Sequence, residues 1–328
     1  MMKLSTMNAV IETVKADGSS EFAERIAQAW QPEPGTVKIF RASANFIFTF
    51  QRAEEKYILR FNHNKERKRK EIEEEIKLLN LLNKKFSNIV IPVKSTDKNF
   101  VETINTDKGT YHVVVFNKVN GKMYEFKELN IENYYTWGKS LGKLHRQMSD
   151  ILRNNEIKRK SWHDHLNFIE KNLPKDEYNA LEELKRMKAW LTNLDIDEKN
   201  YGLIHFDFEL DNLFWEEDEL YIVDFDDAAY YWYVADIAFA LRDLFKQGVN
   251  LKDERFREFI NGYKTEFYLD DDLIKDLPKF LRFHNLTTFT KLLRTLDIKD
   301  TKDKPDWLVN LKNKLSKVVK NYRENFPR

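Results

Sequence analysis

Short apolar runs separated by polar turns dominate the first 120 residues, and they predict an antiparallel β-sheet. The strands that these runs predict cover residues 36–41, 45–50, 56–61, 89–93 and 111–115. Residues 65–85 have a different pattern: apolar side chains recur at spacings of three and four, which predicts one long helix with a single apolar face. A short helix is expected at 21–30, and a polar loop or short hairpin at 96–109.

Beyond the turn at Asn120–Gly121 the apolar positions recur mainly with the period of a helix. The helices expected there cover residues 130–150, 176–192, 236–247, 253–267, 278–297 and 305–324. They are interrupted by a short strand at 203–204, a polar loop at 205–212 and a hairpin of two short strands. A chain of 328 residues exceeds what one compact core usually holds. We therefore expect two lobes, an N-lobe at 1–119 and a C-lobe at 120–328.

The composition indicates a folded protein with no general attraction to anionic partners. Apolar residues make up 42% of the chain and aromatic residues 14%, which is more than disordered chains contain. Charged residues make up 33% but sum to a net charge of +1, so neither nucleic acid nor an anionic membrane is attracted overall. The basic run Lys65–Lys70 is followed at once by acids at 71–75, and we interpret it as the solvated start of a helix.

The absence of cysteine excludes disulfides, thiolate metal sites and a cysteine nucleophile, and it is consistent with a reducing compartment. The first 22 residues do not have the pattern of a secretory signal, and no run approaches the roughly 18 apolar residues of a membrane span. We expect a cytoplasmic protein with no nucleic-acid and no membrane partner.

The candidate chemistry lies between residues 201 and 245, where twelve acidic residues accompany a single basic residue, Arg242. Acids at this density repel one another unless solvent or cations relieve the repulsion. The acids at 216–219 are readily explained as a solvated turn. Asp207 and Asp224 border apolar strands instead, so they are candidates for a functional site.

The spacing of three residues in this stretch suits phosphoryl transfer. That reaction needs oxygen ligands for Mg²⁺ and a carboxylate at the acceptor hydroxyl. In the pattern His-x-Asp-x4-Asn, Asp207 would accept or orient the proton of the acceptor hydroxyl. Asn212 offers an amide oxygen to the metal, and Asp224 offers a carboxylate from the end of the hairpin's second strand. The pairing of the two hairpin strands brings residues 212 and 224 together.

Residues 204–236 resemble the aminoglycoside phosphotransferase and choline kinase family, which is related to the protein kinases. The motifs that carry the resemblance are His205-x-Asp207-x4-Asn212, Val223-Asp224-Phe225 and Asp236-Ile237-Ala238. The sequence Gly138 to His145 is similar to the family's helix that leads toward the catalytic loop. The resemblance implies an α+β, protein-kinase-like two-lobed fold with a β-rich N-lobe, one long helix in it, and a mainly helical C-lobe. It also implies ATP and Mg²⁺ as cofactors.

Four further positions receive a role from the resemblance. His205 and Asp236 would be structural and hold the catalytic loop by hydrogen bonds. Phe116 and Asn117 lie in a segment that resembles the hinge, which reads adenine through its backbone.

The expected phosphate-binding parts depart from the protein-kinase pattern in two ways. The cation on the third strand is Arg60 rather than lysine, and arginine contacts phosphate oxygens through a planar fork. Its acidic partner on the following helix would be Glu75. The phosphate loop at 41–45 has no glycine, although glycine normally lets the backbone approach phosphate. Ser43 and Asn45 would supply polar contacts there instead.

Several polar residues keep more than one interpretation. Asp226 and Asp227 either help a metal, contact a cationic acceptor, or are ordinary charged residues. His163 and His165 lack a further ligand motif and are interpreted as a surface segment, and His145 as a packing residue.

The function expected from these observations is an ATP- and Mg²⁺-dependent transfer of the γ-phosphate to a hydroxyl of a small molecule. A non-catalytic nucleotide-binding module is the first alternative, favoured by the loop without glycine. A metal-dependent hydrolase that uses His205, Asp207 and the acids at 224–227 is the second. The sequence does not identify the acceptor, although Glu209 and Asp211 would suit a cationic amine.

Overall fold

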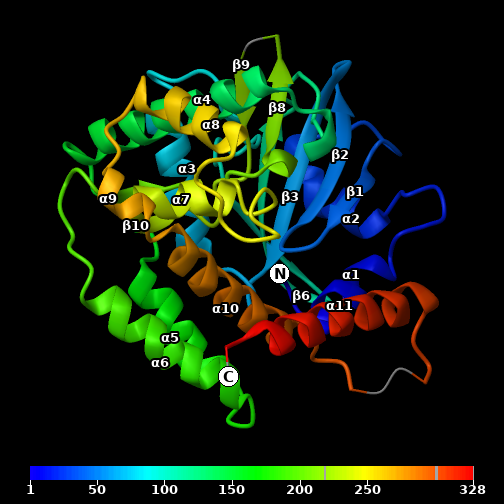
Figure 1. The fold of residues 1–328 in the computed structure, drawn as a ribbon. Coiled ribbons are helices and arrows are strands. Elements are labelled where there is room, and N and C mark those ends of the chain that lie inside the picture. Colours follow the sequence, from blue (N-terminus) through cyan, green and yellow to red (C-terminus); the bar gives the residue numbers. More distant parts are fainter. Residues whose placement is uncertain (218, 300–301, 328) are drawn as a thin grey trace.

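The computed structural model describes residues 1–217, 219–299 and 302–327, and it divides into a sheet-containing part and a mainly helical part (Figure 1). The first part consists of α1 (Leu4–Ile11), α2 (Glu21–Ala27), β1 (Lys38–Ala42), β2 (Phe46–Arg52), β3 (Glu55–His63), α3 (Arg69–Leu82), β4 (Pro92–Val93), β5 (Glu102–Thr106) and β6 (Gly109–Asn117). Its strands form one antiparallel sheet in the order β1-β2-β3-β6-β4, with β5 paired to β6. The expected antiparallel sheet with one long helix in the first part of the chain is therefore confirmed.

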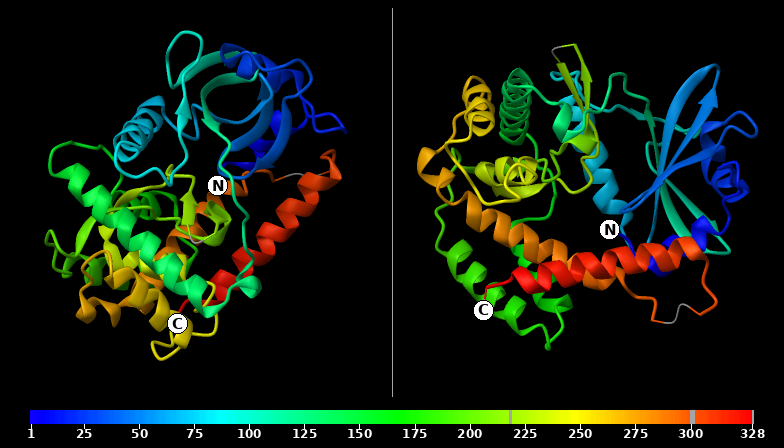
Figure 2. Two further views of the ribbon diagram at one scale, coloured as in Figure 1. Left: turned by 90° about the horizontal axis from the view of Figure 1, so that it is seen from above. Right: turned by 45° about the vertical axis from the view of Figure 1, so that its right-hand side comes forward.

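The two faces of the sheet bury different sets of side chains, because successive residues of a strand point to opposite faces. On β3, Leu59 and Phe61 pack with Phe22 and Trp30 from the α2 region. Ile58 and Arg60 point to the other face, where α3 and the helical part lie. Figure 2 shows the same arrangement, with α1 and α2 on one side of the sheet and α3 on the other.

Helix α3 turns one acid inward. Ile72, Ile76 and Leu79 are buried at spacings of four and three, as the sequence predicts, and Glu75 lies on the same face with 1% of its surface exposed. The neighbouring acids Glu73 and Glu74 are not buried. Glu75 is therefore the acid of this run that reaches the sheet.

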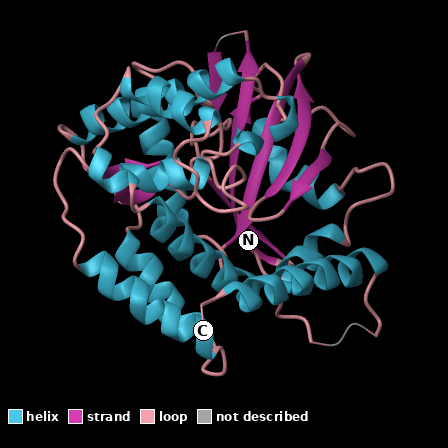
Figure 3. Ribbon diagram, in the orientation of Figure 1, coloured by secondary structure: helices cyan, strands magenta, loops and turns pink. Residues whose placement is uncertain are grey.

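The second part begins after Gly121 and is mainly helical (Figure 3). Its elements are α4 (Ile131–Leu152), α5 (Trp162–Asn172), α6 (Tyr178–Thr192), β7 (Tyr201–Ile204), β8 (Leu213–Glu216), β9 (Glu219–Ile222), β10 (Ala229–Trp232), α7 (Tyr233–Ala240), α8 (Glu254–Lys264), α9 (Asp271–Ile274), α10 (Leu277–Thr295) and α11 (Asp306–Asn325). The strands form two small antiparallel sheets, β7 with β10 and β8 with β9.

A tight turn joins the two parts. Gly121 has a φ of +98°, which favours glycine, and a Cβ there would lie 2.7 Å from the carbonyl oxygen of Trp215. The next residue, Lys122, exchanges backbone hydrogen bonds of 2.8 and 2.9 Å with Trp215. The connecting chain is thereby fixed to β8. The exact lobe boundary at 119/120 remains a prediction.

Helix α11 spans both parts of the molecule (Figure 1). Near its beginning, Trp307 and Leu311 pack on the core between the sheet and α2. Toward its end, Val319 belongs to the core of the helical part, and Arg323 forms an ion pair of 2.6 Å with Glu177. The α11 helix therefore packs on one core near its beginning and on the other core toward its end.

Four of the elements named above were not expected from the sequence: α1, α5, α9 and β10. The interpretation of His165 as a surface residue is wrong, because its side chain is buried on α5 and bonds to the Tyr231 hydroxyl over 2.5 Å. The periodicity that reveals α5 is present, since Trp162, His165, Leu166 and Ile169 are the buried positions of its 11 residues. In the described ranges, no helix is both long enough and apolar enough to cross a bilayer.

Helices α4 and α8 approach each other through glycine. A Cβ on Gly138 would come within 1.9 Å of the carbonyl oxygen of Phe259 on α8. A Cβ on Gly262 would come within 2.0 Å of the carbonyl oxygen of Tyr135 on α4. Any larger residue at either position must push the helix backbones apart.

Replacing Gly138 by alanine is therefore expected to lower the free energy of unfolding by about 1–3 kcal/mol. Urea unfolding followed by circular dichroism measures the change. The matched control is Lys139→Ala on the exposed side of the same helix, which should stay within about 0.5 kcal/mol of the unmodified protein. Equal stabilities of the two variants would contradict the close approach of α4 and α8.

Candidate active site

A buried carboxylate at the start of α7 holds the loop that carries Asp207, here called the Asp207 loop (residues 205–212). Asp236 is fully buried, and its two oxygens accept the backbone N–H groups of His205 at 2.8 Å and Phe206 at 2.9 Å. A buried carboxylate with two backbone donors is stabilised in place by charge-assisted hydrogen bonds. The beginning of the loop is therefore anchored to α7.

The histidine of α4 completes this anchor. His145 Nε2 lies 2.9 Å from Asp236 Oδ2, and its Nδ1 lies 2.8 Å from the Tyr263 hydroxyl on α8. All three side chains are buried. The interpretation of His145 as a packing residue is therefore incomplete, because the ring links α4 and α8 to the Asp207 loop by hydrogen bonds.

The anchor supports a strained backbone. Phe206 has a φ of +75°, a conformation that costs a residue with a side chain about 1–3 kcal/mol. Its ring packs against those of Tyr231 and Phe239, at 5.4 and 5.1 Å between centroids. Hydrogen bonding and ring packing together offset the strain, and they fix the direction in which the following residue, Asp207, leaves the loop.

Asp207 and Asn212 lie at opposite ends of the loop and contact each other. Asn212 Nδ2 donates to the carbonyl oxygen of Asp207 at 2.9 Å and to its Oδ2 at 3.1 Å. The amide nitrogen is thereby occupied, and the amide oxygen of Asn212 makes no hydrogen bond within the described chain. The Asp207 carboxyl is half exposed, whereas Asn212 is buried.

Asp224 follows β9 in a left-handed conformation, with a φ of +62°. The pairing of β8 with β9 places it beside Asn212, whose carbonyl oxygen accepts the N–H of Val223 at 3.0 Å. Its Oδ1 is buried and has no hydrogen-bond partner within the described residues. Burial and then the charge of Asp226 raise the pKa of the Asp224 carboxyl well above its usual value. No hydrogen bond reaches Oδ1 from the described residues, and Arg60 lies 3.6 Å from it.

Arg60 and Glu75 form a forked ion pair on the face of the sheet toward the C-lobe. The two bonds measure 2.8 and 2.7 Å, and both side chains are buried. Burial acts against the charge of Arg60, but Glu75 outweighs it and holds the pKa of Arg60 above its usual value. Nη1 of Arg60 also lies 3.6 Å from Asp224 Oδ1, so the pair reaches the metal-ligand candidate.

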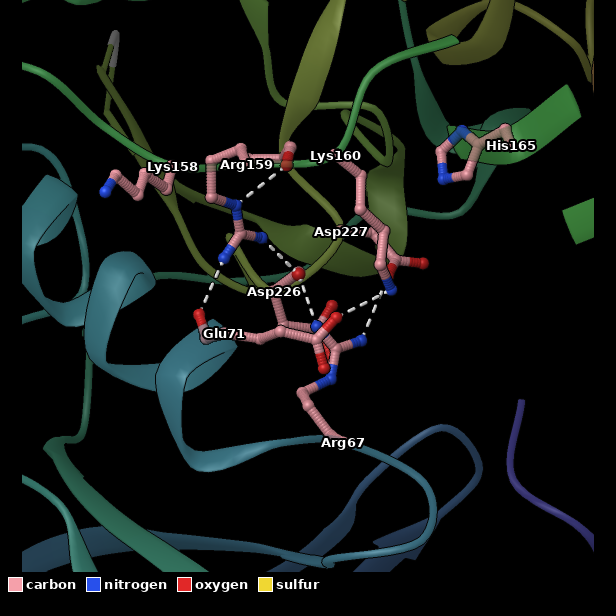
Figure 4. A pocket seen from close by; sticks show the side chains of 9 residues that line it. Arg67, Glu71, Lys158, Arg159, Lys160, His165, Asp226 and Asp227 are labelled. Carbon is pink, nitrogen blue, oxygen red and sulfur yellow. Dashed lines mark hydrogen bonds and ion pairs between the residues drawn. The ribbon is translucent and has the colours of Figure 1, made fainter. Parts of the chain in front are cut away.

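Asp226 and Asp227 are occupied by cations of the chain itself (Figure 4). Arg67 lies 3.0 Å from Asp226 and 2.9 Å from Asp227. Lys291 of α10 lies 3.0 Å from the other oxygen of Asp227. Burial alone would raise the pKa of Asp227, but Lys291 and Arg67 hold it well below its usual range. The two acids therefore serve an ion-pair network that connects the beginning of α3 to α10.

Arg159 fixes the same segment from the other side (Figure 4). Its guanidinium donates to the backbone carbonyl oxygens of Glu71 and Ala228 at 2.9 Å each and of Phe225 at 3.1 Å. It also contacts the carbonyl oxygen of Asp226. The segment after Asp224 is thus attached to α3 through its backbone.

The expected phosphate loop supplies a contact between the lobes. Asn45 is buried: its amide nitrogen donates to Asp226 at 2.9 Å, and its oxygen accepts from Asn62 at 2.6 Å. Its side chain is therefore not free for a nucleotide. Ser43 is partly exposed, and its carbonyl oxygen accepts the N–H of Met2 at 3.1 Å.

The two hinge candidates lie at the end of β6. The Phe116 ring is buried beneath Arg60, whose guanidinium carbon is 5.0 Å from the ring centroid. Asn117 is exposed, and its N–H donates to the carbonyl oxygen of Ile91 at 3.0 Å.

His205 connects the Asp207 loop to the segment after β9. Its Nε2 lies 3.1 Å from the carbonyl oxygen of Val223.

The arrangement fits a magnesium ion that is held partly by the protein and partly by a bound substrate. Asn212 offers a free amide oxygen beside Asp207, and Asp224, which follows the strand paired beside Asn212, offers a carboxylate oxygen without a hydrogen bond from the described residues. Within the described residues no group of three or more His, Cys, Asp or Glu could hold a metal alone. Magnesium in phosphoryl-transfer sites is commonly bound by one or two protein ligands together with substrate phosphates.

Four residues of the site escaped the sequence analysis: Arg67, Arg159, Lys291 and His145 in its polar role. Arg67 stands in the basic run that was interpreted as solvated, and its partners are 159 and 160 positions away. No local periodicity marks such a contact. For His145, the sequence feature that could have indicated its polar role is its place in the Gly138–His145 motif.

Two lobes with the oxygen-bearing side chains of Asp207, Asn212 and Asp224 at their junction are the arrangement expected of a kinase-like phosphotransferase. Residues 36–267 match the sequence model of the Phosphotransferase enzyme family, APH, and the chain belongs to that family. It is 24% identical over 272 residues to the amicoumacin kinase of Bacillus subtilis (strain 168). The match covers 80% of this chain and 81% of that protein. The resemblance noted in the sequence is thereby confirmed, and the chain is a small-molecule kinase that uses ATP.

Solved structures confirm the fold. The amicoumacin kinase hAmiN in complex with AMP-PNP, Ca²⁺ and Ami has a TM-score of 0.77 and 21% identity, and the match covers 93% of this chain and 92% of that chain. A microcompartment-associated aminopropanol kinase has a TM-score of 0.68 and 20% identity, with 92% and 96% covered.

Replacing Asp236 by asparagine is expected to lower the free energy of unfolding by about 2–4 kcal/mol. The variant loses one acceptor oxygen and turns an NH₂ group toward buried N–H donors, which repels them. Thermal and urea unfolding measure the loss.

The matched control for this variant is Asp150→Asn, an exposed carboxyl near the end of α4, which should change stability by less than about 0.5 kcal/mol. If Asp236→Asn were as stable as the control, the buried anchor would not carry the Asp207 loop.

Proposed function

We propose that this kinase transfers the γ-phosphate of ATP to a hydroxyl of a small molecule, with Asp207 at the acceptor and Mg²⁺ between Asn212, Asp224 and the phosphates. The observation that carries the proposal is the convergence of three features: the half-exposed Asp207 carboxyl, the free oxygen of Asn212 and the unpartnered oxygen of Asp224. Asn212 and Asp224 would hold Mg²⁺, which would neutralise negative charge on the phosphates.

The residues of the chain divide the reaction between them. Asp207 accepts the proton of the acceptor hydroxyl as the oxygen–phosphorus bond forms. The bond between the γ-phosphorus and the β,γ-bridging oxygen breaks, and ADP leaves with that oxygen. Arg60, held by Glu75 and adjacent to Asp224, presents positive charge toward the phosphates from the sheet.

The class of acceptor is inferred from which acidic side chains near the site already form ion pairs within the chain. Glu209 and Asp211 had suggested a cationic amine, but Glu209 pairs with Arg242, and Asp211 lies 3.7 Å from Arg41. Asp226 and Asp227 are neutralised by Arg67 and Lys291. We therefore propose an acceptor that is recognised through its hydroxyl and its shape, not a polycation.

Two further statements are proposals: that the chain is catalytic, and that it lies in the cytoplasm. A non-catalytic nucleotide-binding module is disfavoured, because Asp207, Asn212 and Asp224 are all present and adjacent. A cytoplasmic location is proposed on the need for ATP.

Replacing Asp207 by asparagine is expected to lower kcat for phosphoryl transfer by about 10²–10⁴-fold, because the amide cannot accept the hydroxyl proton. The assay follows ADP release with ATP, Mg²⁺ and a panel of hydroxyl-bearing acceptors. ATP binding, measured by calorimetry, should be unchanged. The matched control is Glu216→Gln at the exposed end of β8. Full turnover in Asp207→Asn would refute the proposed role.

Replacing Asp224 by asparagine is expected to remove the increase in ATP affinity that Mg²⁺ produces, by a factor of about 10–100. The measurement is calorimetric titration of ATP with Mg²⁺ and, separately, with a chelator. Affinity in the chelator should match that of the unmodified protein. A variant that keeps its full response to Mg²⁺ would show that the metal lies elsewhere.

A further inference from the structure

The one basic residue in the acidic stretch 201–245 is Arg242. It lies next to Asp207, the carboxylate proposed to accept the proton of the acceptor hydroxyl. Arg242 follows the end of α7, and its Nη1 lies 3.5 Å from Asp207 Oδ1. Its Nη2 contacts Glu209 Oε2, so the side chain is held by an acid of the Asp207 loop itself. Arg242 is 32% exposed and Asp207 38%, so the contact is open to a ligand and not sealed in the core.

The other cations near the site are committed to partners. Both terminal nitrogens of Arg60 bond to Glu75, and the residue is only 3% exposed. Arg67 and Lys291 pair with Asp226 and Asp227. Arg159 donates to backbone carbonyl oxygens. In the described ranges, the cation that contacts Asp207 is Arg242.

The neighbourhood contains a histidine that adds no second charge. Burial, and then the positive charge of Arg242, lower the pKa of His284 well below its usual value. The imidazole on this side of α10 is therefore neutral at physiological pH, and the positive charge next to Asp207 belongs to Arg242.

The chemistry of the step requires positive charge at this place. Negative charge is spread over the three equatorial oxygens of the transferring phosphoryl group, and preorganised donors stabilise it. The acceptor oxygen must lie within hydrogen-bond reach of Asp207 and in line with the γ-phosphorus. A guanidinium 3.5 Å from Asp207 lies beside the place where the acceptor oxygen would meet the γ-phosphorus.

We propose that Arg242 is a catalytic residue that binds the transferring phosphoryl group, and that Glu209 positions it. This inference rests on the proposed function. As the acceptor oxygen bonds to phosphorus and its proton moves to Asp207, the Arg242 fork donates to phosphoryl oxygens while the bond to the ADP oxygen breaks. Glu209 positions the guanidinium through its other terminal nitrogen, Nη2, while Nη1 faces Asp207.

The test uses a stand-in for the phosphoryl group, so it does not depend on knowing the acceptor. ADP, Mg²⁺ and tetrafluoroaluminate are added to the full chain, and the melting temperature is followed. In the unmodified protein, tetrafluoroaluminate is expected to raise the melting temperature beyond the value with ADP and Mg²⁺ alone. In Arg242→Met this additional rise should disappear, while the rise from ADP and Mg²⁺ remains and shows that the variant is folded.

Turnover provides the second readout, with any acceptor from the panel that the unmodified protein phosphorylates. Arg242→Met should lower kcat about 100-fold with KM for ATP unchanged, whereas a purely structural contact would alter stability and both constants together. Arg242→Lys keeps the charge but loses the fork, so it should retain an intermediate kcat. Glu209→Gln should lower kcat about tenfold.

The matched control is Arg255→Met, which removes another C-lobe arginine that pairs with a nearby carboxylate, Asp253. It should keep both the tetrafluoroaluminate response and kcat. A full tetrafluoroaluminate response in Arg242→Met, or none in an unmodified protein that still binds ADP and Mg²⁺, would overturn this inference. An unmodified protein that binds no ADP with Mg²⁺ would instead refute the proposed function itself.

Discussion

The buried carboxylate of Asp236 is the interaction on which the site depends. It accepts two consecutive N–H groups from the Asp207 loop and contacts His145, so one residue of α7 connects the loop to α4 and, through Tyr263, to α8. A polar group this deep is stable only when every partner is present. The left-handed turn at Phe206 is tolerated for the same reason: the surrounding contacts offset its strain.

The N-lobe is connected to this anchor by a second set of contacts. Arg60 of β3 joins Glu75 of α3 to Asp224, and Asn45 joins the β1–β2 turn to Asp226. Arg67 and Arg159 fix the segment after Asp224 through side chains and carbonyl oxygens. The lobes therefore meet through charges and amides at the segment proposed to hold the metal, and also through apolar packing of α3 and β6 against the helical part.

Local sequence signals predicted the parts of the site that lie within one motif. The spacing of Asp207, Asn212 and the hairpin was sufficient to place them together, because a short loop and a two-stranded pairing leave few other geometries. Asn45 was different: its partner Asp226 is 181 positions away, and its side chain bonds across the lobes instead of facing outward. Contacts made by folding distant segments together leave no periodic trace in the sequence, so Arg67 and the polar role of His145 were missed.

Helix α11 sets a limit on how the two lobes move. Because Trp307 and Leu311 pack on one core and Val319 on the other, moving the two lobes directly apart would expose these side chains to water or break the helix. A nucleotide would therefore enter and leave while both ends of α11 stay attached to their cores.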